Sequence, residues 1–177
     1  MLILIVGMPS SGKTTAAQIF EEMGFSVAST GDIVREEIKS RDLSYTKEND
    51  REVADWFHEE GRETLVIERL LSKLKGKNKV IEGLRDPKQM ERLENKTGKR
   101  PVIIAIESSF ESRLKRELAK KRFPDMTRED LEKRDQAELR LGEGELIGKA
   151  DYTIDNTNLT KEELKEELKK ILEDINI

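Results

Sequence analysis

Apolar runs and helical apolar stripes alternate along the chain. Residues 2 to 6, LILIV, form an unbroken apolar run, the pattern of a strand buried on both faces of a parallel sheet. Shorter runs predict further strands at residues 25–29, 79–82, 101–107 and 152–155. Because helical segments separate these strands, the pattern predicts an α/β fold with a five-stranded parallel sheet.

The helical segments are marked by apolar residues three and four positions apart and by capping residues at their ends. The first helix is expected to start near Lys13 and to stop at Gly24. Asp86 and Pro87 are residue types typical of an N-cap and of the first helical position. Two pairs have the spacing of a capping box: Asn49 with Glu52, and Thr160 with Glu163.

Residues 7–14, GMPSSGKT, match the phosphate-loop pattern G-x-x-x-x-G-K-[ST] between a buried strand and an amphipathic helix. Glycines let consecutive N–H groups face a phosphate chain, and the helix N-terminus adds positive potential. In such a loop Lys13 contacts the β and γ phosphates of a nucleotide such as ATP, and the Thr14 hydroxyl binds Mg²⁺. The motif predicts a P-loop NTPase three-layer fold. The expected nucleotide-binding residues are Gly7, Pro9, Ser10, Ser11, Gly12, Lys13, Thr14 and Thr15.

Length and composition narrow the class further. The 177 residues suggest a single domain, and 33 Lys and Arg nearly balance 37 Asp and Glu, which argues against binding nucleic acid through bulk charge. Cysteine is absent, and the N-terminal apolar run is far too short for a signal segment or a membrane span. We therefore expect a cytoplasmic protein with no membrane partner. Its oligomeric state stays open.

The strands and helices divide the chain into a core with two insertions. The core is expected at residues 1–30, 76–107 and 150–177. Residues 31–75 are helical and lie where an acceptor-binding insertion is expected. Residues 108–149 are highly charged and contain glycines near their end, which is typical of a mobile cover over a phosphate site.

Two segments resemble adenylate kinases. Residues 29–35, STGDIVR, look like the family's S-T-G-D-x-x-R, and residues 82–85, EGLR, with Gln89 four positions on, are similar to D-G-F-P-R-x-x-x-Q. The second match has Glu for Asp and lacks one residue before the arginine. The closest overall similarity is to a poorly characterised archaeal family related to adenylate kinase.

This resemblance implies roles for the matching residues. Arg35 and Arg85 would hold the phosphate of an acceptor, Gln89 would read its base, and Glu82 would lie near the Mg²⁺. Two guanidiniums can bind a phosphate bidentately and fix its direction of attack, which supports these roles independently. Asp32 is either a helix N-cap or a group that orients the acceptor. The implied acceptor site comprises Thr30, Gly31, Asp32, Arg35, Gly83, Arg85 and Gln89.

A basic segment at residues 113–122 supplies further cations for phosphoryl transfer. On a helix Phe110, Leu114 and Leu118 would form a buried stripe, while the basic residues share another face. A solvated basic face is the alternative reading. Arg134 resembles part of the R-x-D-D element that follows the adenylate kinase lid. The candidate catalytic residues are Lys13, Arg113, Arg116, Arg122 and Arg134.

The resemblance favours phosphoryl transfer from ATP to a nucleoside monophosphate, preferably AMP. Residues 150–156, ADYTIDN, look like the A-D-x-x-I-x-N ending of dephospho-coenzyme A kinases, which keeps a sugar hydroxyl as an alternative acceptor. If this resemblance has no functional meaning, Asn156 only ends a buried strand with a turn. An NTP-hydrolysing switch or assembly factor is a further alternative. In such a protein water is the acceptor, so a pair of acceptor-binding arginines would have no function. His58 is given no catalytic role, and Trp56 and Phe57 are expected in the core.

Overall fold

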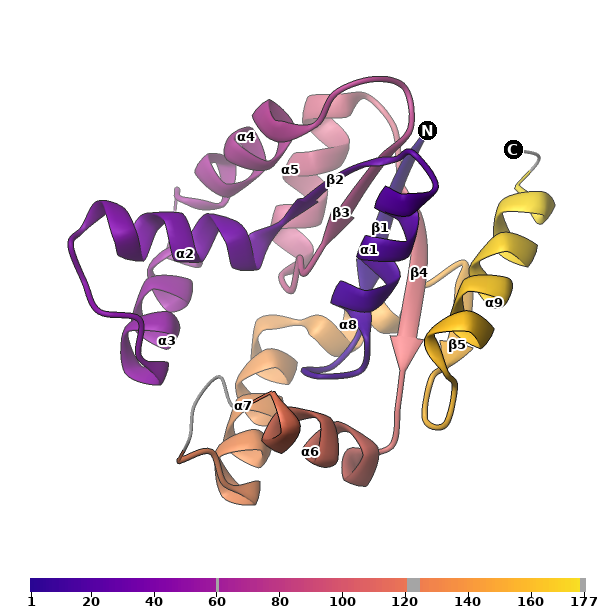
Figure 1. Ribbon diagram of the computed structural model, residues 1–177. Helices are drawn as coiled ribbons and strands as arrows, with labels where there is room; N and C mark the ends of the chain where they lie inside the picture. Colours follow the sequence, from indigo (N-terminus) through magenta and orange to yellow (C-terminus); the bar gives the residue numbers. More distant parts are fainter. Residues whose placement is uncertain (60, 121–124, 176–177) are drawn as a thin grey trace.

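The computed structural model describes residues 1–59, 61–120 and 125–175, and its strands form one sheet with helices on both faces (Figure 1). The strand order is β2-β3-β1-β4-β5, and every neighbouring pair is parallel. The predicted five-stranded parallel sheet is confirmed. The strands are β1 (Leu2–Val6), β2 (Ser26–Ser29), β3 (Lys79–Glu82), β4 (Val102–Glu107) and β5 (Tyr152–Asp155).

The central strand β1 brings the functional loops to one edge of the sheet. Ile5 of β1 lies beside Glu82 of β3, and Ser29 of β2 lies on the other side of Glu82. Parallel strands end at the same edge, so the loops that follow β1, β2 and β3 meet there. This carboxyl edge is where open α/β sheets bind ligands.

Most of the helices in the described part of the chain cover the sheet, and two groups extend beyond its carboxyl edge. One group stands between β2 and β3 and the other between β4 and β5, where the sequence places its two insertions. Figure 1 shows α3 (Lys47–Trp56) of the first group and α6 (Phe110–Ala119) and α7 (Arg128–Leu141) of the second at the same end of the sheet. In chain order the helices are α1 (Lys13–Glu22), α2 (Thr30–Ser40), α3 (Lys47–Trp56), α4 (Glu63–Lys73), α5 (Pro87–Thr97), α6 (Phe110–Ala119), α7 (Arg128–Leu141), α8 (Glu143–Gly148) and α9 (Lys161–Asp174).

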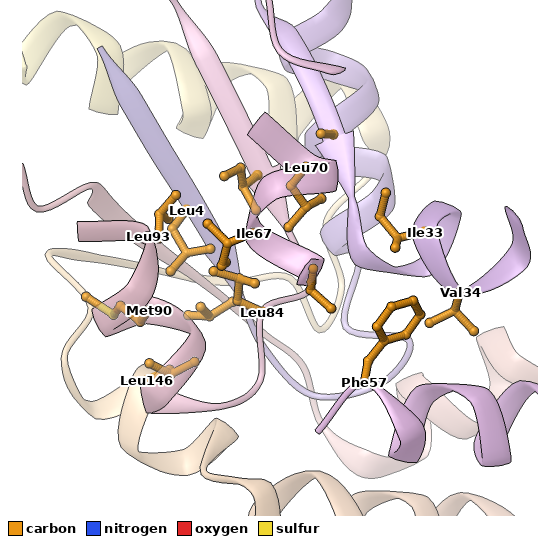
Figure 2. Packing of buried hydrophobic residues seen from close by; sticks show 14 of the residues in the cluster. Leu4, Ile33, Val34, Phe57, Ile67, Leu70, Leu84, Met90, Leu93 and Leu146 are labelled. Atoms are coloured by element: carbon orange, nitrogen blue, oxygen red, sulfur yellow. The ribbon is translucent and has the colours of Figure 1, made fainter. Parts of the chain in front are cut away.

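Two hydrophobic clusters bury the two faces of the sheet. Leu2, Leu4 and Val6 of β1 belong to one cluster, which includes residues of α4, α5 and α8 and is shown in part in Figure 2. Ile3 and Ile5 belong to the other cluster, together with residues of α1 and α9. Burial on both faces explains why β1 is apolar at every position.

One predicted helix start, at Asn49, is wrong, and so is one of the two roles considered for Asp32, that of an N-cap. Thr46 caps α3, and its hydroxyl accepts a hydrogen bond from the Asn49 amide at 3.2 Å, so Asn49 lies inside the helix. Ser29 caps α2, which places Asp32 in the first helical turn. In both cases a hydroxyl three residues earlier begins the helix. None of the helices in the described ranges has the length and apolar character that crossing a bilayer requires.

Candidate active site

The phosphate loop, residues 7–14, opens into a cavity of about 710 Å³ at the carboxyl edge of the sheet. Gly12 has a φ of +116°, and a Cβ atom there would lie 2.2 Å from Nδ2 of Asn156, so the position requires glycine. Gly7 and Ser11 are buried within the loop. The predicted loop residues that line the cavity are Pro9, Ser10, Gly12, Lys13, Thr14 and Thr15.

Lys13 is held at the wall of this cavity by the loop itself. Its ammonium group donates to the carbonyl oxygens of Gly7 and Met8, the latter at 3.0 Å. Burial lowers the pKa of Lys13, and the nearby carboxylate of Glu143 opposes that shift. Lys13 and the buried carboxyl group of Glu143 both form hydrogen bonds with the backbone of Gly7.

Helix α6 carries the first part of the predicted basic segment and packs against the loop. Arg113 donates to the carbonyl oxygen of Pro9 at 3.1 Å and forms two hydrogen bonds to the Asp135 carboxylate at 2.8 and 2.6 Å. Arg116 donates to the carbonyl oxygen of Ser11 at 3.0 Å and also lines the phosphate cavity. Arg113 is only 5% exposed, so its arrangement favours bracing the loop, whereas Arg116 can also reach a ligand.

The expected apolar stripe of α6 is wrong at Leu118, which is 50% exposed. The helix instead buries Glu117, whose carboxylate accepts hydrogen bonds from the Ser10 hydroxyl and from the Lys120 ammonium, the latter at 3.0 Å. Burial alone would raise the pKa of Glu117, but the Ser10 hydroxyl, Lys120 and Arg134 lower it below its ordinary value. On this face α6 packs against the polar phosphate loop, not against an apolar neighbour.

Arg134 of α7 lies where the cavities of the site meet. Its guanidinium is 3.6 Å from the carboxylate of Glu117 and 3.9 Å from that of Glu138. Arg134 lines the phosphate cavity and the smaller cavity beside it. The fourth candidate arginine, Arg122, lies outside the described residues.

Glu82 and Thr14 form an oxygen-lined corner next to the phosphate loop. The Thr14 hydroxyl lies 3.2 and 3.3 Å from the two carboxylate oxygens of Glu82, and the Ser29 hydroxyl donates to Oε1 of Glu82 at 2.9 Å. Carboxylate and hydroxyl oxygens are the donors that Mg²⁺ prefers. The residues present therefore fit a Mg²⁺ ion bound with a triphosphate.

A second cavity, of about 50 Å³, lies beside α2 and α3 and has an apolar wall with polar groups at its rim. Figure 2 shows Phe57 beside Val34 on its apolar side. Arg35 lines the larger cavity instead, and Asp32 is exposed and paired with Arg35. The predicted acceptor residues that line the second cavity are Thr30, Gly31, Gly83, Arg85 and Gln89.

Both arginines of the predicted acceptor site already have carboxylate partners. Arg35 pairs with Asp32 on the same helix, where both side chains are about half exposed. Arg85 lies 3.0 Å from Glu138, whose side chain is 6% exposed. An incoming phosphate must therefore displace these carboxylates or use the remaining N–H groups.

His58, for which no role was predicted, lines the second cavity. Its Nδ1 atom is buried, has no hydrogen-bond partner among the described residues, and lies 3.7 Å from Oδ2 of Asp86. Burial lowers the pKa of His58, which favours the neutral imidazole. Phe57 is buried as expected, whereas Trp56 is partly buried between two guanidiniums, each 4.2 Å from its ring.

Three residues that contribute to the site were not among the predicted site residues. Asn156 is 5% exposed, and its side-chain amide donates to the carbonyl oxygen of Ser11 at 2.7 Å, so it does more than end a strand. Glu138 and Glu143 are also buried, at 4% and 1% exposed. Only the A-D-x-x-I-x-N pattern pointed to Asn156. Nothing marked the two glutamates, because a chain with 40% charged residues contains many similar ones.

The fold and the site together define a P-loop kinase: a parallel sheet, a phosphate loop on its central strand, and basic helices beside an adjoining cavity. Residues 6–140 match the model of the family described as AAA domain. The chain belongs to the UPF0200 family. UPF0200 protein TK1334 of Thermococcus kodakarensis is 37% identical over 99% of this chain and 98% of that protein. UPF0200 protein PF1294 of Pyrococcus furiosus is 36% identical over 97% of this chain and 96% of that protein.

Solved structures show the same fold in more distant proteins. Shikimate kinase from Acinetobacter baumannii in complex with shikimate has a TM-score of 0.64 and 20% identity, covering 99% of this chain and 94% of that one. Shikimate kinase from Aquifex aeolicus has a TM-score of 0.63 and 20% identity, covering 100% and 99%. The predicted P-loop kinase fold and the resemblance to an archaeal family are confirmed.

Proposed function

We propose that this protein transfers the γ-phosphoryl group of ATP, bound with Mg²⁺, to a nucleoside monophosphate, preferably AMP. One observation carries the proposal. The second cavity, called the acceptor cavity from here on, shares part of its wall with the larger cavity at the phosphate loop, the phosphate cavity, so ligands bound in the two cavities would meet. The shared residues are Thr30, Gly31, Gly83, Arg85 and Arg134. A hydrolase acting on water needs no second cavity of this kind.

The wall of the acceptor cavity favours a nucleobase as the group bound there. Its apolar part includes Val34, Ala54 and Phe57, while Gln89 and His58 supply polar groups at the rim. An apolar slot with a few polar groups is the usual form of a small-molecule site. The volume of about 50 Å³ is small for a purine, so the cavity would have to widen when the acceptor binds.

Basic side chains of the site would orient the acceptor and stabilise the transferred phosphoryl group. Arg35 and Arg85 would hold the acceptor phosphate, while Lys13, Arg116 and Arg134 would face the transferred group, where an added arginine can be worth about 10³ to 10⁵ in rate. A phosphate acceptor is already a nucleophile and needs no general base. Thr14 and Glu82 would hold the Mg²⁺, which supplies charge neutralisation at the phosphates when bound.

The described parts of the segment 108–149 would form a cover over this site. Helix α6 carries Arg116 to the phosphate cavity, and helix α7 carries Arg134 to the wall that the two cavities share. Closure over both ligands would exclude water and so limit wasteful hydrolysis.

The test is transfer of labelled phosphate from ATP to AMP, other nucleoside monophosphates and dephospho-coenzyme A, using wild type and Asp32→Asn. We expect transfer to AMP and little effect of Asp32→Asn, because no proton has to be removed from the acceptor. Preferred transfer to dephospho-coenzyme A, with collapse of Asp32→Asn, would replace this proposal with a hydroxyl acceptor. Release of phosphate without any acceptor product would indicate an NTP-hydrolysing switch.

A further inference from the structure

His58 carries a largely buried imidazole at the wall of the acceptor cavity. Its side chain is 12% exposed, and its Nδ1 atom is buried without a hydrogen-bond partner among the described residues. Oδ2 of Asp86 lies 3.7 Å from Nδ1, which is too far for a hydrogen bond. A buried polar group without a partner lowers stability, so the fold alone does not account for an imidazole at this position.

Two separate elements bring polar side chains to this small cavity. His58 follows α3 in a turn that is closed by its own amide, which donates to the carbonyl oxygen of Asp55 at 2.9 Å. The preceding residue, Phe57, is 2% exposed and anchors the turn in the hydrophobic cluster on that face of the sheet. Gln89 of α5 lines the same cavity and is also 2% exposed. The two polar side chains are therefore held at one cavity by packed structure.

Asp86 determines which nitrogen of His58 carries the proton. Oδ1 of Asp86 accepts from the Lys88 amide at 2.8 Å and caps α5, which leaves Oδ2 as an acceptor on the side of Nδ1. Burial lowers the pKa of His58, and the positive charge of Arg85 lowers it further. The arrangement therefore favours a neutral imidazole with its one proton on Nδ1, toward the carboxylate, and a lone pair on Nε2.

This tautomer makes His58 selective toward a ligand in a way that Gln89 is not. The side-chain amide of Gln89 can turn to present either its oxygen or its NH₂ group, so it accepts or donates as the ligand requires. Nε2 of His58 can only accept. An amino group on a base would donate to it, whereas a carbonyl oxygen would meet it lone pair to lone pair.

We propose that His58 is a specificity-determining residue of the acceptor cavity, whose Nε2 accepts a hydrogen bond from an amino group of the acceptor's base and so selects a base with an amino group over one with a carbonyl oxygen. The inference rests on the proposed function in taking a nucleoside monophosphate as the acceptor, and it names the chemical group that is read. Adenine carries such an amino group, and hypoxanthine carries a carbonyl oxygen in the same place. A bond to Nε2 would also strengthen the interaction of Nδ1–H with Asp86, because linked hydrogen bonds polarise one another.

The test uses AMP, IMP and purine riboside monophosphate, which share sugar and phosphate and carry an amino group, a carbonyl oxygen and a hydrogen at that place. Affinities are measured by calorimetric titration at about pH 8, where the imidazole is neutral. The wild type should bind AMP most tightly and IMP most weakly, and the third nucleotide separates lost attraction from added repulsion. In His58→Leu, which has no acceptor, the preference for AMP over IMP should fall by about tenfold to 100-fold.

Two further variants show whether the effect belongs to the Nε2 lone pair. His58→Gln keeps a polar side chain, but its NH₂ group can donate to a carbonyl oxygen, so the preference for AMP over IMP should also fall. Glu59→Gln is the matched control, because Glu59 is the next residue, is exposed, and pairs with Arg62 at 2.6 Å. This control should keep the wild-type preference.

A purely structural role of His58 would weaken AMP and IMP alike and leave their ratio unchanged, and that result would overturn the proposal. Equal affinity of the wild type for AMP and IMP would overturn it as well, and this comparison needs no variant that must fold. Absence of phosphoryl transfer from ATP in the wild type would refute the proposed function instead. The calorimetric ratio would still decide the role of His58 in that case, since it is measured without ATP.

Discussion

Replacing Arg85 by alanine tests the acceptor site and the ion pair beneath it in one experiment. Arg85 lines both cavities, and its Nε lies 3.0 Å from a carboxylate oxygen of Glu138. Without Arg85 the phosphate of the proposed acceptor would lose a charge-assisted partner. Such a loss amounts to about 2 to 4 kcal/mol, or about 30- to 1,000-fold in kcat/KM for the acceptor.

The same change also lowers the stability of the fold. Glu138 is 4% exposed, and Arg134, 3.9 Å away, would be its remaining ion-pair partner among the described residues. A buried carboxylate that loses its partner costs about 1 to 3 kcal/mol. For a chain of this size, each kcal/mol lowers the melting temperature by about 2 to 4 °C.

A double variant separates the two effects. In Arg85→Ala/Glu138→Gln the buried charge is removed together with its partner, so most of the lost stability should return while acceptor use stays impaired. The assay is steady-state transfer from ATP to AMP, alongside thermal unfolding and ATP affinity, which should stay near wild type throughout. If the double variant recovers acceptor kinetics along with stability, Arg85 acts through the fold, and its proposed contact with the acceptor is wrong.

Three further predictions follow from the site. Lys13→Ala should abolish transfer while the protein still unfolds cooperatively; wild-type turnover in saturating MgATP would contradict the role of Lys13. Gly12→Ala should cost at least tenfold in MgATP affinity, because a Cβ atom would meet Asn156 at 2.2 Å in a backbone conformation that disfavours alanine; calorimetric titration with MgATP would show this. Amide exchange in residues 108–120 and 125–149 should slow when a two-substrate analogue binds, and unchanged exchange would argue against a cover.

The sequence predicted the sheet and the phosphate loop well because both have strong local signals. The unbroken apolar run of β1 reflects burial on both faces, and the glycine-lysine pattern that follows it reflects the backbone shape that a phosphate chain requires. The predicted N-cap of α3, Asn49, lies three residues after the observed one, Thr46, for a physical reason. Two polar residues three apart compete as caps, and the Thr46 hydroxyl, not the Asn49 side chain, accepts the capping hydrogen bond, which the backbone amide of Asn49 donates.

The partners of the charged groups could not be predicted from the sequence. A basic stripe on α6 suggested cations free to meet a ligand, yet Arg113 is fully engaged by Asp135 and by the carbonyl oxygen of Pro9. Leu118 was assigned to the core because its spacing fits a stripe, but the face that α6 buries is turned toward the polar loop. Periodicity shows that a helix has a special face; it does not show whether that face meets apolar or polar groups.

The pairing of cations with carboxylates has a consequence for how the site would open and close. Glu117, Glu138 and Glu143 all come from helices α6 to α8, and between them they neutralise groups that a phosphate ligand would need, including Arg85 and Lys13. A triphosphate is a stronger partner for those cations than a carboxylate, because it carries more charge and more acceptor oxygens. Binding of nucleotide would therefore weaken the electrostatic interactions between these cations and the glutamates of α6 to α8. Movement of the cover would then be coupled to ligand charge through the ion pairs that these glutamates form.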